Sequence, residues 1–333
     1  MKNYRTYIGI DVAKLTLDYC IVKEDPQLEQ GQILNTQKSV DKFLKTLKKT
    51  GCQMNETLFV FENTGIYSSL LALVLSENSL DYAQVPALEI KRSLGITRGK
   101  SDKVDAKEIA HYAKRNTDKI ALSILPEISL QQLKIVFAER EKTVAAIKTF
   151  ERTKENEMFL TKEVFNSVKA INNQTVKHLK KQLVMLDEKI RTLIREDENL
   201  YGQQQLLKSI PGIGDITSVY ILMATKGFTA FTSGRKFACY SGVAPFEHSS
   251  GTSIKGKTRV SHLADKKMKT LLHMASLTAI KYDPELKDYY NRKKAEGKHT
   301  MLVLNNIKCK MVYRIFAVIQ RKSNFVNLHK FAA

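Results

Sequence analysis

Four acidic residues stand where their side chains together could bind divalent metal ions. Asp11 follows the apolar run YIGI, Glu62 follows the apolar run TLFVF, and Asp102 and Asp105 lie three residues apart, the spacing of neighbours on a helix face. Carboxylate oxygens are ligands that Mg²⁺ and Mn²⁺ prefer. Two such ions about 4 Å apart stabilise the attacking and the leaving oxygen at a phosphate. The four residues therefore predict metal-dependent cleavage of a phosphodiester.

Each of these acids also has a structural explanation. An aspartate after YIGI can cap a strand, and Asp102 and Asp105 can form the acidic first turn of a helix, where the helix dipole favours them. The set of four, in the chain order described next, favours the metal site. Glu108, one helical turn after Asp105, is either a carboxylate that supports the metal ligands or a solvated surface acid.

The elements that would hold these acids follow the order βββαβαβα. The predicted strands span residues 7–13, 17–22, 31–36, 57–62 and 82–85, and the predicted helices span residues 39–49, 67–75, 87–94 and 102–114. This is the order of ribonuclease H and of Holliday-junction resolvases, in which the first strand and the strand after the first helix lie side by side. Asp11 and Glu62 would then meet at one end of the sheet, in an RNase H-like, RuvC-like α/β domain of residues 1–125.

Residues 126–200 predict a helical hairpin or coiled coil. The segment from Ser129 to Leu200 is rich in lysine and glutamate and has no glycine or proline, so we expect helix throughout, apart from a break from Asn166 to Gln174. An apolar seam with alternating three- and four-residue spacing runs through Val176, Leu179, Leu183, Leu186, Ile190, Leu193 and Leu200. The seam fits either an arm that packs on its own partner helix or an arm that joins copies of the chain. We favour the second, because recombination needs several strand breaks held in register.

Basic residues dominate the chain and concentrate in a mainly helical third domain of residues 201–333. The whole chain has 54 Lys and Arg against 34 Asp and Glu, a net charge of +20. Residues 201–333 hold 22 basic and seven acidic residues, which is three quarters of that excess. An excess of this kind predicts a polyanionic partner such as double-stranded DNA.

A glycine turn opens this third domain. In LLKSIPGIGDITSVYILMAT, Pro211, Gly212 and Gly214 stand between two apolar helical segments, which resembles a helix-hairpin-helix element. Glycines at a helix N-terminus can present backbone N–H groups to phosphates without reading sequence. The alternative is a plain turn between two helices.

The block FACYSGVAPFEHSSGTSIKGKTRVS is dense in small, hydroxyl and basic residues, the composition of a loop that approaches a phosphate closely. Lys255, Lys257 and Arg259 are either phosphate anchors or a cationic environment for a serine alkoxide. A serine hydroxyl becomes a good nucleophile only when a base, a metal or such an environment stabilises its alkoxide. Composition alone does not separate a nucleophile from a polar turn.

The segments YIGIDVAK, FENTG and KSDKVDA resemble the three signature blocks of the DEDD transposases of bacterial insertion sequences. These are relatives of the Piv-type DNA invertases and are also known as bridge-RNA-guided recombinases. The similarity continues through the C-terminal half. By matching motif positions, it implies that the family's acidic tetrad falls on Asp11, Glu62, Asp102 and Asp105, with Mg²⁺ or Mn²⁺ as the cofactor.

The family's catalytic serine precedes a Gly, a small or hydroxyl residue and Ser, then a hydrophobic residue, a basic residue and Gly. That pattern falls on residues 250–256, SGTSIKG. The resemblance thus implies Ser250 as the nucleophile, with Ser249 as the nearest competitor. His248, two residues earlier, is either a base for this serine or a positioned loop histidine.

The resemblance implies an RNA-guided DNA recombinase that cuts and rejoins strands through a phosphoserine link. Its implied partners are donor and target double-stranded DNA, a structured bridge RNA and further copies of the chain in a dimer or tetramer. The carboxylates and the serine lie in different domains, so we expect a site that is complete only when domains from different protomers meet. One rival is a RuvC-like nuclease or junction resolvase that uses water as the nucleophile. The other is a nucleic-acid-binding protein with purely structural acids.

The sequence also argues against several other classes of protein. Cys20, Cys52, Cys239 and Cys309 show no metal-ligand or CxxC spacing and fit reduced thiols. The chain begins without an apolar signal region, and no stretch approaches 18 uncharged apolar residues. We therefore expect no membrane partner and a cytoplasmic, nucleoid-associated bacterial protein.

Overall fold

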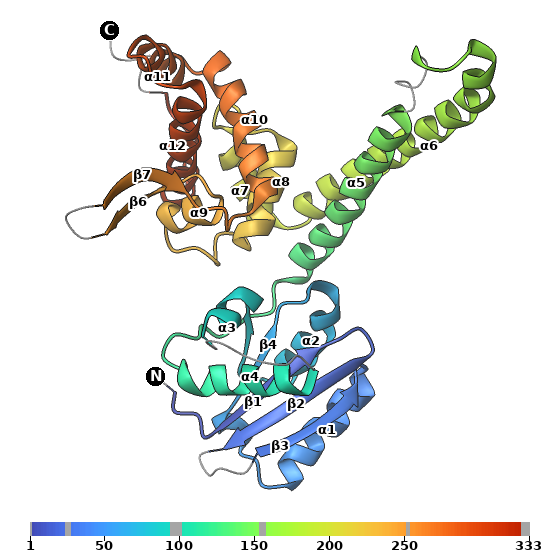
Figure 1. Cartoon of the computed structure of the whole chain (residues 1–333), viewed down its shortest axis with the longest axis vertical. Helices are drawn as coiled ribbons and strands as arrows, with labels where there is room; N and C mark the ends of the chain where they lie inside the picture. Colours follow the sequence, from blue (N-terminus) through green and yellow to red (C-terminus); the bar gives the residue numbers. More distant parts are fainter. Residues whose placement is uncertain (1, 24–27, 94–101, 153–157, 251–253, 328–333) are drawn as a thin grey trace. The chain divides into compact units, whose positions relative to one another are not determined.

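The computed structural model describes residues 2–23, 28–93, 102–152, 158–250 and 254–327. The chain divides into two compact units, residues 1–125 and residues 126–333 (Figure 1). No helix in the described part of the chain combines the length and the apolarity that a membrane crossing requires.

The first unit is built on a five-stranded sheet in the order β3-β2-β1-β4-β5. Its strands are β1 (Thr6–Val12), β2 (Thr16–Lys23), β3 (Leu28–Leu34), β4 (Thr57–Glu62) and β5 (Tyr82–Val85). The first three strands follow one another closely in the chain and pair antiparallel, whereas β4 and β5 join in parallel after helical segments. The predicted RNase H-like order, with the first and fourth strands adjacent, is confirmed.

Helices cover both faces of this sheet (Figure 1). They are α1 (Gln37–Lys49), α2 (Ser69–Glu77, after a 3₁₀ turn at Gly65–Ser68), α3 (Ala87–Ser93) and α4 (Asp102–Arg115). Strand residues alternate between the faces. Ile8 and Ile10 of β1 pack in the core with α1 and α2, whereas Tyr7 packs on the other face with Ile109 of α4.

The second unit begins with a helical hairpin of α5 (Ile128–Arg152) and α6 (Lys162–Arg195). Ion pairs join Arg140 to Asp187 at 2.6 Å and Glu151 to Lys180 at 2.8 Å, so the helices run antiparallel. The predicted seam is their contact face: its α6 members are half-buried or buried, and Leu200 is buried in the following helix.

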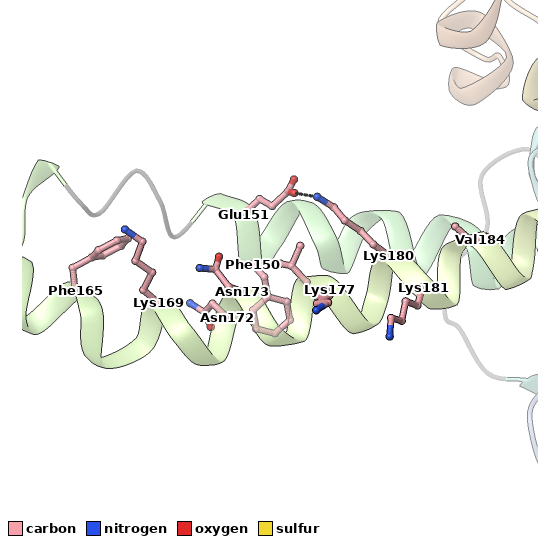
Figure 2. A pocket seen from close by; sticks show the side chains of 11 residues that line it. Phe150, Glu151, Phe165, Lys169, Asn172, Asn173, Lys177, Lys180, Lys181 and Val184 are labelled. Carbon is pink, nitrogen blue, oxygen red and sulfur yellow. Dashed lines mark hydrogen bonds and ion pairs between the residues drawn. The ribbon is translucent and has the colours of Figure 1, made fainter.

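The predicted break from Asn166 to Gln174 is wrong, because α6 runs unbroken through those residues (Figure 2). The turn of the hairpin lies upstream, where Thr161 caps α6 by accepting a hydrogen bond from the Val164 N–H. Asparagine and glutamine cost only tenths of a kcal/mol inside a helix, on the order of 0.5 kcal/mol each. A run of them therefore does not end a helix by local propensity alone.

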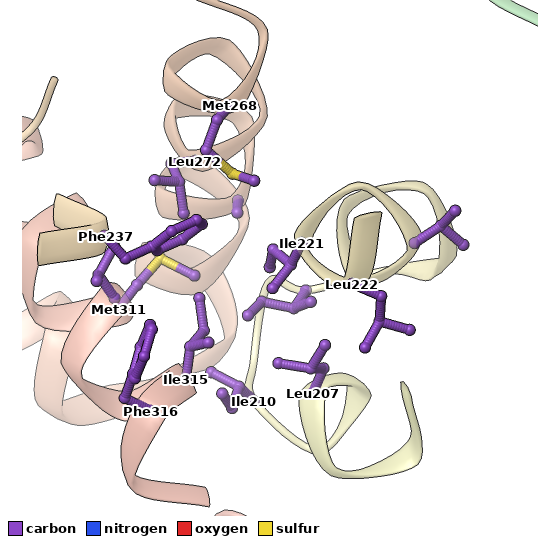
Figure 3. Close-up of a cluster of buried hydrophobic side chains, with 14 of the residues drawn as sticks. Leu207, Ile210, Ile221, Leu222, Phe237, Met268, Leu272, Met311, Ile315 and Phe316 are labelled. Atoms are coloured by element: carbon purple, nitrogen blue, oxygen red, sulfur yellow. The ribbon is translucent and has the colours of Figure 1, made fainter. Parts of the chain in front are cut away.

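The remaining elements form a mainly helical body. They are α7 (Glu198–Lys208), α8 (Asp215–Thr225), α9 (Gly234–Tyr240), β6 (Pro245–Ser250), β7 (Ile254–Val260), α10 (Lys266–Tyr282), α11 (Pro284–Ala295) and α12 (Thr300–Arg321). One apolar core joins these helices, with Phe237, Leu272 and Ile315 fully buried inside it (Figure 3). Leu133 of α5 and Ile194 of α6 belong to the same core, so the root of the hairpin is anchored in the body.

The expected loop in the block from Phe237 to Ser261 is wrong. The block ends α9 and then forms an antiparallel hairpin of β6 and β7, with Ser250 paired to Ile254 and Pro245 paired to Val260. Backbone pairing outweighs the high content of small residues, because the threonine, isoleucine and valine of β7 favour strand. An irregularity in the register lies between the pairs of Phe246 and His248.

The turn at Pro211, Gly212 and Gly214 joins α7 to α8, as predicted. Gly212 has a φ of +95°, and a Cβ on it would lie 2.3 Å from the Ala275 carbonyl oxygen of α10. Gly214 caps α8 with open space around it. Gly212 is therefore a packing residue, whereas Gly214 faces no such constraint.

We expect Gly212→Ala to lower the free energy of unfolding by about 3 kcal/mol, because strain at positive φ adds to a backbone clash. Gly214→Ala is the matched control and should change it by less than about 1 kcal/mol. Thermal and urea melts of both variants measure the difference. Equal stability of the two variants would contradict the close approach of α10.

Candidate active site

The alternation of the two central strands places Asp11 and Glu62 on the same face of the sheet. On β1, Tyr7, Gly9 and Asp11 share the face that α4 covers, and on β4 the residues of this face are Leu58, Val60 and Glu62. The last pairing between the strands joins Ile10 to Phe61, directly before the two acids. Asp11 and Glu62 thus lie side by side at the carboxyl ends of adjacent parallel strands.

Helix α4 brings the other two acids to this face. Asp102 and Asp105 occupy its first turn, and Ala106 and Ala110 of the same helix pack on the sheet. A Cβ on Gly9 would lie 2.2 Å from the Ala110 backbone nitrogen and 2.4 Å from the Ala106 carbonyl oxygen. The helix backbone therefore rests directly on β1, and no residue other than glycine fits between them.

The four carboxylates share one electrostatic field. The pKa of Asp11 is raised to about 6, first by burial and then by the negative charges of Asp105, Asp102 and Glu62. Like charges disfavour ionisation of a neighbouring carboxyl group, and burial adds to that effect. The acids of β1, β4 and α4 therefore act on one another across the face of the sheet.

The donor set fits a hard divalent cation, because it consists of carboxylate oxygens that repel one another. Two residues after Glu62, the Thr64 Oγ1 atom is buried and has no hydrogen-bond partner among the described residues. Within the described residues, no three Asp, Glu, His or Cys side chains are gathered tightly enough to enclose an ion. The four predicted ligands therefore influence one another electrostatically, but the described residues do not form a closed set of metal ligands.

Two further acids belong to this neighbourhood. Asp18 stands opposite Asp11 in the β1–β2 register, is buried, accepts a hydrogen bond from Gln32 Nε2 at 2.9 Å and adds to the field on Asp11. Sequence reasoning missed it, although its place on the next strand is a usable signal. Glu108 is half-buried, and burial followed by the charge of Asp105 raises its pKa.

The residues predicted for the C-terminal half lie on the β6–β7 hairpin. Ser250 is the last residue of β6, and Lys255, Lys257 and Arg259 lie on β7. The side chains of Ser250, Lys255 and Lys257, and the whole of residues 251–253, lie outside the described residues. Arg259 is exposed and lies opposite Phe246 in the pairing of β7 with β6. The backbone thus places the predicted nucleophile and the predicted phosphate anchors on one hairpin.

Basic and aromatic residues also meet on the helical arm, which sequence reasoning missed. A pocket of about 490 Å³ lies along α5 and α6, with Phe150, Phe165, Asn173, Lys177 and Lys181 among its lining residues (Figure 2). Lys169 lies over the Phe165 ring, 5.2 Å from its centroid. The signal in the sequence was the run of lysines beside the apolar seam.

Two sequence profiles match the chain. One, described as the Transposase IS116/IS110/IS902 family, matches residues 204–291, and the other, described as Transposase, matches residues 8–156. The fold and these matches define a transposase or recombinase, an enzyme that acts on DNA by cutting and rejoining strands. The chain belongs to the IS110 family of DEDD transposases.

Several known proteins are similar to this chain. The pilin gene-inverting protein of Moraxella bovis is 28% identical over 326 residues, covering 96% of this chain and 98% of that protein. The insertion element IS900 uncharacterized 42 kDa protein of Mycobacterium paratuberculosis is 33% identical over 134 residues, covering 39% of this chain and 33% of that protein. The structure of T. thermophilus RuvC with a Holliday junction substrate matches 36% of this chain and 100% of its own, at 12% identity and a TM-score of 0.27.

We expect Gly9→Ala to lower the free energy of unfolding by about 3 kcal/mol, because the added methyl group meets helix backbone that cannot rotate away. Gly31→Ala on β3 is the control: the atoms nearest its Cβ belong to the end of the Tyr19 side chain, which can move, so the cost should be about 1 kcal/mol. Urea melts of both variants measure the two costs. A Gly9→Ala protein as stable as wild type would show that α4 does not rest on β1.

Proposed function

We propose that this chain is an RNA-guided DNA recombinase that cuts and rejoins strands through a phosphoserine intermediate. The observation that carries the proposal is the shared field of Asp11, Glu62, Asp102 and Asp105, within a chain of net charge +20. Acids concentrated against so strong a basic excess are best explained by a divalent cation at a phosphate. We assign Mg²⁺ or Mn²⁺ to this tetrad.

In the proposed reaction the Ser250 oxygen attacks phosphorus and forms a phosphoserine ester. The bond between phosphorus and the leaving sugar oxygen breaks, and that oxygen takes a proton. A sugar hydroxyl of the exchange strand then attacks the same phosphorus, releases Ser250 and restores a phosphodiester. One ester bond replaces another at each step, so no ATP is required. Divalent ions, when bound, supply charge neutralisation at the phosphoryl oxygens.

The serine assignment draws its support from the family pattern and from the hairpin. Ser250 ends β6 beside a strand that carries Lys255, Lys257 and Arg259. Three basic residues within five positions favour a phosphate nearby and lower the cost of an alkoxide. We assign these three residues, and the α8 N-terminus at Gly214, to contacts with the DNA backbone. Asp215, at the start of α8, forms an ion pair with Lys208, with 2.6 Å between Oδ1 and Nζ. This ion pair reduces the repulsion between Asp215 and a phosphate.

We assign the guide RNA to the helical arm and the basic body. The arm pocket offers the lysines and aromatic rings that contact phosphates and unpaired bases. The arm also carries an apolar stripe of Val164, Val168 and Ile171, spaced by four and three residues and 55%, 47% and 64% exposed. Such a stripe fits a second copy of the chain, and we propose a dimer or tetramer. In the cell we expect the protein on the bacterial nucleoid, where its DNA lies.

We expect Asp11→Asn, Glu62→Gln, Asp102→Asn and Asp105→Asn each to reduce strand cleavage about 10²-fold or more, since each removes a charge that holds the metal. Affinity for DNA should stay within about twofold, because binding rests on basic residues elsewhere. Asp118→Asn, an exposed acid in the same unit, is the control. Cleavage on a nicking gel and affinity by anisotropy separate the two effects, and normal recombination by two of the tetrad variants would refute the assignment.

The serine mechanism predicts a covalent protein–DNA adduct that survives denaturation in the presence of Mg²⁺. Ser250→Ala should abolish the adduct and recombination together, because alanine has no oxygen to attack phosphorus. Ser249→Ala and Ser253→Ala are the matched controls and should retain at least part of both. Peptide mass spectrometry locates the link. Strand cutting by Ser250→Ala at the normal rate, with no adduct, would favour the rival nuclease that uses water.

A further inference from the structure

A second cavity lies where the root of the helical arm joins the body. Its volume is about 520 Å³, within the range of about 300–1,000 Å³ that small-molecule sites occupy. Its lining includes Lys134 and Phe137 of α5, Tyr220 of α8, Lys226 after α8, Tyr240 of α9 and Lys267 of α10. Aromatic rings and basic side chains therefore face one space.

The aromatic wall is held in place by one carboxylate. The Tyr220 and Tyr240 hydroxyl groups both donate to Asp265 Oδ2, at 2.9 and 2.8 Å, while Asp265 Oδ1 accepts a hydrogen bond from the Met268 N–H at 2.8 Å. The Tyr220 ring also packs on Phe137, with centroids 5.6 Å apart. Because both hydroxyls are engaged, the two rings are fixed in orientation, and Tyr240 remains 38% exposed.

The basic side chains of the cavity are only partly neutralised. Lys267 forms an ion pair with Glu141, but no ion pair or side-chain hydrogen bond is recorded for Lys134 or Lys226 within the described part of the chain. Lys134 is exposed as a whole residue, yet desolvation of its ammonium group, followed by the charge of Lys226, lowers its pKa. Two ammonium groups that repel each other in this way are stabilised when an anion binds between them.

Lys226 also occupies a backbone position that costs stability. Its φ is 50°, and Gly227 and Phe228 follow with φ of 62° and 65°. A left-handed conformation is unfavourable for a non-glycine residue, and glycine is the usual residue at this place after a helix. Thr225 Oγ1 accepts a hydrogen bond from the Phe228 N–H at 3.1 Å and holds the turn. A lysine kept in a strained turn, with its side chain lining a cavity, is typical of a binding role.

We propose that this cavity binds one unpaired nucleotide of a single-stranded nucleic acid, with the base on the Tyr220 and Tyr240 wall and the phosphate between Lys134 and Lys226. Base faces stack on aromatic side chains without regard to sequence, and lysines contact the phosphodiester. A base in a duplex is stacked and paired, so the site selects unpaired strands. The inference rests on the proposed function only in that the chain handles nucleic acid; the strand is DNA or RNA.

The test measures single-strand affinity by fluorescence anisotropy on the full-length protein, with labelled single-stranded DNA, single-stranded RNA and blunt duplex DNA as probes. The variants are Lys134→Gln and Lys226→Asn, since asparagine tolerates left-handed backbone. Lys148→Gln removes the same charge from an exposed position on α5 and is the matched control. We expect each pocket variant to weaken binding of a single strand about tenfold relative to the control, and of the duplex by less than about twofold.

The strand that loses affinity identifies the source: loss for DNA alone indicates an extruded DNA nucleotide, and loss for RNA alone indicates a guide nucleotide. A 2-aminopurine base in that strand should be quenched by wild type and by Tyr240→Phe, but not by Tyr240→Leu, which lacks the ring. The proposal would be overturned if the pocket variants lost equal affinity for duplex and single strands. It would also be overturned if they lost no more affinity for single strands than Lys148→Gln does. Either result leaves duplex cleavage by wild type intact, so it is distinguishable from failure of the proposed function.

Discussion

The close approach of α4 to β1 is the constraint on which the catalytic unit depends. Gly9 lets the helix backbone rest on the strand, and only at that distance do Asp102 and Asp105 enter the field of Asp11. The packing free energy of the small Ala106 and Ala110 contacts must offset the repulsion between carboxylates, which a divalent cation would relieve. Under the proposed mechanism, stability and catalysis therefore compete at this one contact.

The acidic tetrad and the basic excess lie in different parts of the chain. The acids that matter gather on one face of the first unit, whereas the basic excess lies mainly in residues 201–333. Under the proposed function, the second unit offers two kinds of platform for a polyanion: the β6–β7 hairpin with its basic strand, and aromatic cavities lined by lysines. An enzyme that must hold several strands needs more contact surface than one phosphate site, and under the proposed function these two platforms provide it.

Much of the first unit could be predicted from the sequence, because period-two alternation and chain order already place Asp11 and Glu62 on neighbouring strands. The packing at Gly9 could not, since it depends on a helix about a hundred residues away. The break expected from Asn166 was wrong because the local cost of asparagine and glutamine in a helix is too small to end one. The loop expected around Ser250 was wrong because composition says nothing about cross-strand pairing. Local patterns predict elements well, whereas contacts between distant segments decide where elements end.

The pKa of Asp11 in the metal-free protein tests the central claim most directly. Carboxyl ¹³C NMR, with the resonance assigned by its loss in Asp11→Asn, follows this group through a pH titration. The account predicts a pKa of about 6, which falls in Asp105→Asn because the largest repulsion is removed, and which stays unchanged in Asp118→Asn. A value near 4 that does not respond to Asp105→Asn would show that α4 does not bring its acids to β1.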